Sequence, residues 1–157
     1  MTEAPEIILC TPACHVGTWR SLVLVCWGSE TNATGVDAIR KALENVCAAN
    51  PNGVGIIVQI DLRSKPPGKE MRDQLAALQT AFPAVRASAN VVSGKGLAVA
   101  TARSVIAGMM LLARSETPQR VFATTHEAAS WIAPFVPGLA NVTPDEIASA
   151  VESLRVA

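Results

Sequence analysis

The chain has 157 residues, half of them hydrophobic and only 4% aromatic, which suits one domain with an aliphatic core. Thirteen basic residues balance thirteen acidic ones and no block of like charge occurs, so nucleic acid is not an expected partner. The longest apolar run, residues 97–113, contains Arg103 and is shorter than the roughly 20 residues that cross a bilayer, so we expect no membrane span.

Two short apolar segments open the chain, residues 6–10 and 21–27, and both have the composition of strands. The segment between them contains Pro12 and Gly17, which favour a loop. We therefore expect the sheet to begin with an antiparallel pair of strands joined by an irregular connection.

The middle of the chain alternates between helical and strand patterns. Two stretches carry apolar residues at helical spacing with polar residues on the other face. Residues 54–60 between them are almost continuously apolar, which is typical of a central strand covered on both faces, and a strand at 85–92 follows. The apolar faces of the two helices are Val36, Ile39, Leu43 and Val46 in the first, and Met71, Leu75, Leu78 and Phe82 in the second.

Residues 97–113 predict an apolar helix, which we expect to lie in the core. Its large apolar residues occupy nearly half of the circumference, while Ala100, Ser104 and Gly108 share the opposite side with Arg103. Small residues allow another helix to approach closely. Two interpretations are open: contact with a neighbouring helix of the same chain, or the seam of a homodimer.

The last part of the chain contains a short strand at 120–124 and two helices with clear start signals. Thr124 with Glu127, and Thr143 with Glu146, match the capping pattern in which a hydroxyl side chain binds the backbone of the first turn. We expect one domain over residues 1–157, with a core at about 6–135 and a helical appendage at 138–157.

Strands that alternate with helices imply right-handed crossovers and a mainly parallel sheet with helices packed on it. The sequence therefore predicts an α/β fold with a mixed, mainly parallel sheet of four to five strands and an extra C-terminal helix.

The four cysteines and two histidines do not form a convincing metal site. Cys26 and Cys47 fall in apolar segments, where a reduced cysteine behaves as a small hydrophobe. Cys10, Cys14 and His15 can approach one another in a loop, but zinc requires a fourth ligand that the pattern does not offer. We expect no metal and no other cofactor.

The turn "VVSGKG", residues 91–96, leads from a strand into the apolar helix. Free amides at a helix start, two glycines able to form an amide nest, and the Lys95 ammonium would favour an anion. The turn lacks both the P-loop spacing and the dinucleotide-binding glycine pattern, and a plain strand-to-helix turn also needs glycine. The candidate anion-binding residues are Ser93, Gly94, Lys95 and Gly96.

Several polar residues follow predicted parallel strands, and ligands in open α/β sheets lie beyond the carboxyl ends of the strands. A nucleophile with a base and an orienting group in reach is not evident among them, so we expect no enzyme activity. The residues expected at this rim are Asp61, Ser64, Ser93, Lys95, Thr124, Thr125 and His126.

The order of elements resembles that of the STAS domain and of the related bacterial SpoIIAA-like proteins, which are grouped with lipid-binding Sec14-type domains. The matching stretches are "SLVLVCWG", "VGIIVQID", "ANVVSGKG" and "RVFATTHEAASWI", over about residues 6–135. In the phospho-switch members of this family, a serine after the central strand is phosphorylated. The resemblance places Ser64 in that connection as a phosphorylation site or part of a partner loop, although the family's Asp-Ser-Ser-Gly type pattern is absent.

The resemblance implies a non-catalytic module that binds a protein partner or a small ligand in the bacterial cytoplasm, and a homodimer is compatible with it. The sequence opens without a charged segment followed by an apolar one, which also favours the cytoplasm. Two alternatives stay open. One is a carrier of an apolar ligand, as in the Sec14-type relatives; the other is an enzyme that acts on a phosphorylated small molecule at residues 93–96.

Overall fold

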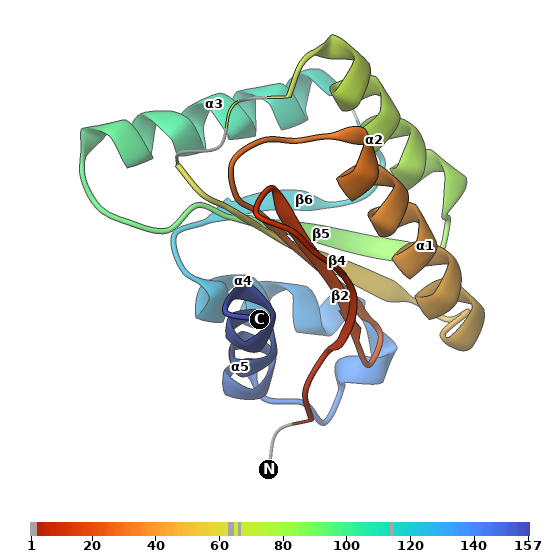
Figure 1. The fold of residues 1–157 in the computed structure, drawn as a ribbon. Coiled ribbons are helices and arrows are strands. Elements are labelled where there is room, and N and C mark those ends of the chain that lie inside the picture. Colours follow the sequence, from red (N-terminus) through yellow and green to blue (C-terminus); the bar gives the residue numbers. More distant parts are fainter. Residues whose placement is uncertain (1–2, 63–64, 66, 114) are drawn as a thin grey trace.

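A computed structural model describes residues 3–62, 65, 67–113 and 115–157, and in it one sheet separates two layers of helices (Figure 1). The strands are β1 (Glu6–Cys10), β2 (Cys14–Trp19), β3 (Leu22–Trp27), β4 (Val54–Ile60), β5 (Val85–Val91) and β6 (Gln119–Phe122). The helices are α1 (Ala33–Ala49), α2 (Lys69–Ala81), α3 (Leu97–Ala113), α4 (Thr125–Ile132) and α5 (Pro144–Arg155), with short 3-10 turns at Ala133–Phe135 and Pro137–Leu139.

The six strands lie side by side in chain order. β1, β2 and β3 pair antiparallel, whereas β3, β4, β5 and β6 pair parallel. The α/β class and the mainly parallel, mixed sheet are therefore confirmed, with six strands in place of the expected four to five.

β2 is the strand that the sequence analysis took for a loop. Its six residues, CHVGTW, contain a glycine and two polar side chains and follow Pro12 closely, which hides the strand pattern. The expected antiparallel pair of residues 6–10 and 21–27 is consequently wrong, because β2 lies between these strands and pairs with both.

β3 is the most thoroughly covered strand, since all of its residues are buried. Alternate side chains point to opposite faces of a strand, so Leu22, Leu24 and Cys26 enter one core cluster while Val23, Val25 and Trp27 enter the other. Each face of the sheet therefore has its own hydrophobic core.

The two cores are covered by different parts of the chain. The crossover helices α1, α2 and α3 lie on one face, and α4 and α5 lie on the other (Figure 1). A right-handed crossover between neighbouring parallel strands puts its helix on a fixed side, so strands added in a single direction place all their helices on the same face. The opposite face is left to the segment that follows β6.

α5 belongs to that second layer and is not an appendage. Its Ile147, Ala150, Val151 and Leu154 are buried in the same cluster as Leu22, Leu24 and Ile57 of the sheet. Gly17 of β2 allows the close approach, because a Cβ atom there would stand 3.1 Å from Leu154 Cδ1 and 2.9 Å from the carbonyl oxygen of Glu6. The core therefore extends beyond residues 6–135.

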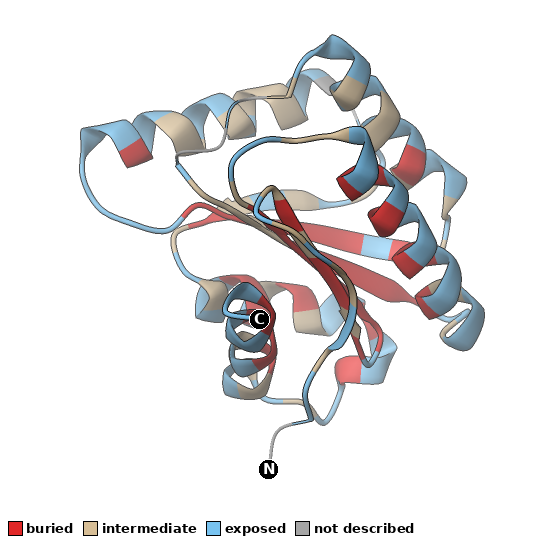
Figure 2. Ribbon diagram, in the orientation of Figure 1, coloured by how far each residue is buried: buried red, intermediate tan, exposed pale blue. Residues whose placement is uncertain are grey.

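α3 is a helix, as expected, but it is not a core helix. Val99 is its only buried residue among those described, and Figure 2 shows the rest as intermediate or exposed. The expectation that its large residues are all buried is wrong, because α3 crosses to the edge strand β6 and only its inner side meets the sheet. In the described part of the chain, none of the helices combines the length and the apolar character that a bilayer crossing needs.

We expect Leu154→Ala to destabilise the fold by about 2–5 kcal/mol, because it removes a fully buried side chain and leaves a cavity between α5 and β2. Urea denaturation measures the change, with Ser153→Ala, at an exposed position of the same helix, as the control. Equal stability of both variants would contradict the assignment of α5 to the core layer.

Candidate functional site

A cavity of about 400 Å³ lies at the carboxyl ends of β3, β4 and β5. We call it the strand-end cavity. Part of its wall comes from residues at the start of β2 and from Arg155 at the end of α5. The side chains that offer hydrogen-bonding groups to it include His15, Gln59, Asp61, Ser93 and Arg155.

The register of the sheet brings three of the lining residues into one row. His15 of β2 is paired with Cys26 of β3, and Cys26 is paired with Gln59 of β4. Paired residues on neighbouring strands point to the same face, so these side chains stand next to one another beneath the end of α5. The Gln59 side-chain oxygen Oε1 is buried and has no hydrogen-bond partner among the described residues.

The two thiols that line the strand-end cavity are neutral. Burial raises the pKa of Cys14 and that of Cys26 to about 12, so neither forms a thiolate near neutral pH. Arg155 donates from Nε to Glu152 Oε2 at 2.8 Å, and this hydrogen bond lowers the pKa of the Glu152 carboxyl. The cavity therefore combines an apolar wall with fixed polar groups, which is an arrangement for binding.

Only some of the residues expected beyond the carboxyl ends of the parallel strands lie together in the structure. Asp61 and Ser93 line the strand-end cavity, whereas Lys95 and Thr125 are not part of its lining. Thr124 caps α4 by accepting a hydrogen bond from the Glu127 backbone N–H, as the capping pattern predicted. Ser64, the expected phosphorylation site, lies outside the described residues.

The turn at residues 93–96 is built around Arg103. The Arg103 guanidinium donates to the carbonyl oxygen of Val92 at 2.9 Å and to that of Gly94 at 2.8 Å. Gly94 and Gly96 have φ values of 120° and 103°, which side-chain-bearing residues rarely adopt. These contacts account for the glycines and for Arg103 as parts of a strand-to-helix turn, and Lys95 in it is exposed.

The potential metal ligands do not converge. Cys10 Sγ lies 3.7 Å from His15 Nε2, but Cys14 contributes to the core on the opposite face of the sheet. Among the described residues, no group of three or more His, Cys, Asp or Glu side chains could hold a metal ion.

The sequence analysis missed Gln59 and Arg155. Gln59 is the one polar residue in an otherwise apolar strand segment. A polar residue in such a segment indicates a functional position, so the sequence did contain a signal for Gln59. Arg155 offers no such signal, because its place over the cavity depends on how α5 packs across the sheet.

The outer face of α3 is a second candidate surface. Leu97, Leu111 and Leu112 are 85%, 80% and 84% exposed, and Val105 is also exposed. Arg103 is the only charged residue in the helix, and it is turned toward the preceding turn. The outer face of α3 is thus an uncharged, largely apolar surface in contact with solvent.

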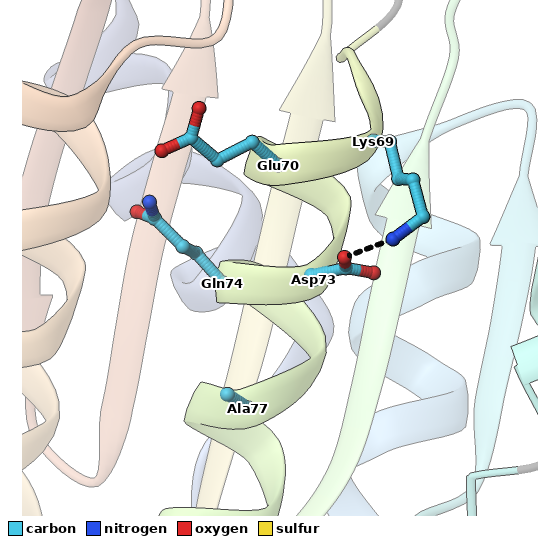
Figure 3. A pocket seen from close by; sticks show the side chains of 5 residues that line it. All are labelled: Lys69, Glu70, Asp73, Gln74 and Ala77. Carbon is cyan, nitrogen blue, oxygen red and sulfur yellow. Dashed lines mark hydrogen bonds and ion pairs between the residues drawn. The ribbon is translucent and has the colours of Figure 1, made fainter.

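A shallow hollow of about 550 Å³ runs along the exposed side of α2 (Figure 3). Lys69 and Asp73 form an ion pair at 2.9 Å across one turn, and Glu70 and Gln74 project away from that pair. Every residue that lines this hollow belongs to the one helix, so it has no opposite wall to enclose a ligand.

Comparisons with protein families, with curated proteins and with solved structures find no match to this chain.

Proposed function

We propose that the protein is a non-catalytic interaction module, in keeping with the resemblance to cytoplasmic bacterial STAS and SpoIIAA-like regulators. Its docking surface is the outer face of α3, and its partner is a second copy of the chain. The observation that carries the proposal is the exposure of three leucines on a helix face without charge. Soluble proteins rarely leave a contiguous apolar surface of this kind uncovered.

The small residues of α3 lie on this exposed face and not against a neighbouring helix. At 100° per residue, Ala100, Ser104 and Gly108 fall between Leu97 and Leu111 on the outward side. The exposure of these residues favours the second interpretation, in which they meet another molecule.

The outer face is also self-complementary. Leu97 and Leu111 are each seven residues from Ser104, and Ala100 and Gly108 are each four residues from it. Two antiparallel copies of α3 related by a two-fold axis at Ser104 would place each leucine against the leucine at the other end of the partner helix. Closed dimers use such isologous contacts, in which one patch meets its own copy.

The expected dimer is weak. Burial of a leucine contributes about 1.5–3 kcal/mol, so Leu97 and Leu111 from two copies contribute about 6–12 kcal/mol. Association costs about 4–15 kcal/mol in lost translational and rotational freedom. The two quantities are of similar size, so these leucines leave little net free energy and we expect weak, readily reversible association.

We expect Gly108→Leu to weaken dimerisation about tenfold or more, because the added side chain would hold the two helices apart. In the single chain a Cβ atom at Gly108 meets nothing within 4 Å, so the substitution leaves the fold of the monomer intact. Sedimentation equilibrium over a range of protein concentrations measures the effect.

The matched control is Ala76→Leu, at an exposed position of α2, which adds a leucine away from the proposed seam. It should dimerise like the wild type. A wild-type protein that is monomeric at every concentration, or a Gly108→Leu dimer of unchanged strength, would contradict the proposal.

A second candidate function is the binding of a small polar molecule in the strand-end cavity. This function is favoured because polar residues from different elements line the same cavity: His15, Gln59, Ser93 and Arg155. A carrier of an apolar ligand would need a cavity between the sheet and α3. This alternative gains no support, because neither hollow described above is lined by a residue of α3. The enzyme alternative at residues 93–96 gains none either, since Arg103 already explains the turn.

We expect native mass spectrometry of the purified protein to show a bound small molecule, because a cavity of about 400 Å³ with fixed polar groups suits one. Ser93→Trp should lower its occupancy by filling the cavity from an exposed position. Wild-type protein that carries no bound mass, or equal occupancy in both proteins, would count against this second function.

A further inference from the structure

We propose that Cys10 is a nucleophilic thiol that undergoes exchange with low-molecular-weight disulfides, and that His15 acts as its base. The pair lies on the antiparallel part of the sheet, next to the strand-end cavity and apart from the outer face of α3. Cys10 and His15 therefore take no part in the proposed dimer contact.

The geometry is that of a nucleophile, a base and an orienting group. Cys10 of β1 is paired with His15 of β2, and Cys10 Sγ lies 3.7 Å from His15 Nε2. His15 Nδ1 lies 2.8 Å from the carbonyl oxygen of Leu154 in α5. A carbonyl oxygen can only accept a hydrogen bond, so Nδ1 is the donor, and in the neutral tautomer with its proton at Nδ1 the Nε2 atom that faces the thiol is an acceptor. An activated cysteine needs this arrangement.

The other three cysteines are poor nucleophiles. Cys14 and Cys26 are buried, and burial raises the pKa of each thiol to about 12. Burial also raises the pKa of Cys47. Since the thiolate is the reactive form, these thiols react slowly near neutral pH, whereas Cys10 is exposed and has a base beside it.

Cys10 has no partner within the chain for a disulfide. Cys26 lies on the same row of the sheet but two strands away, at about 10 Å by the usual strand spacing. A disulfide requires Cα atoms within about 7 Å. Cys14 and Cys47 both belong to the core on the opposite face. A disulfide of Cys10 must therefore join a thiol from another molecule.

The exchange is balanced without a further reactant. The proton of the Cys10 thiol passes to His15 Nε2, and the Cys10 sulfur attacks one sulfur of the external disulfide. A new sulfur–sulfur bond forms while the external bond breaks, and the departing thiolate takes the proton back from His15. The products are a mixed disulfide on Cys10 and one free small thiol.

A mixed disulfide on Cys10 would change the contacts at the end of α5. The Cys10 thiol also donates to the backbone oxygen of Ala157 at 3.5 Å, and His15 Nδ1 contacts the Leu154 carbonyl oxygen. A group attached to Cys10 would remove the hydrogen bond to Ala157, so we expect the modification to weaken the contact between β1 and the residues that follow α5.

The test uses the full chain and oxidised glutathione as the disulfide. We expect intact-mass spectrometry to show one glutathione per chain, and peptide mapping to place it on Cys10. Cys10→Ser should remove the fast reaction, while Cys47→Ser should leave it unchanged. Modification that persists in Cys10→Ser at the wild-type rate would overturn the assignment of the thiol.

His15→Asn separates the base from the structural contact, because its amide can still donate to the Leu154 carbonyl oxygen but cannot accept the thiol proton. We expect the rate of modification of Cys10 to fall about tenfold or more, with the unfolding temperature close to that of the wild type. His15→Ala also loses the contact with the Leu154 carbonyl oxygen, so it should lower both the rate of modification and the unfolding temperature. A His15→Asn protein that reacts as fast as the wild type would overturn the role of His15.

Discussion

The fold depends on one constraint: both faces of a hydrophobic sheet must be covered, while every crossover between neighbouring parallel strands turns in the same hand. Because β3, β4, β5 and β6 are added in one direction, α1, α2 and α3 all lie on one face. The other face is covered by α4 and α5, which pack against each other as well as on the sheet. The C-terminal helix is therefore as necessary to the core as any crossover.

The same constraint explains why two parts of the surface are left open. α3 is the last crossover and lies over the edge strand β6. In the described part of the chain, no later element covers its outer side, because the chain then passes to the opposite face. On that opposite face, α5 ends above β2 and β3, where Arg155 becomes part of the strand-end cavity and the Leu154 carbonyl oxygen meets His15. The exposure of the outer face of α3 and the placement of His15 beneath the end of α5 thus follow from one topology.

Local signals in the sequence predicted most of the elements, and tertiary arrangement decided the rest. The caps at Thr124 and Thr143 were predicted because a hydroxyl three residues before a glutamate is a local pattern. β2 was missed because strand pairing outweighed its weak local preference. The apolar composition of α3 predicted a helix, but composition does not say whether another element will cover it. At the site, Asp61 and Ser93 were foreseen from their positions after strands, whereas Gln59 and Arg155 depend on register and on packing across the sheet.

We propose that two copies of α3 meet about a two-fold axis at Ser104, and disulfide trapping tests this arrangement. On such an axis, residue 104 is the only helix position that faces its own copy. In a Cys10→Ser background, which removes the exposed native thiol, Ser104→Cys should form a disulfide-linked dimer under mild oxidation, and Leu111→Cys should not. Equal yields from the two positions, or no linked dimer from Ser104→Cys, would contradict the account.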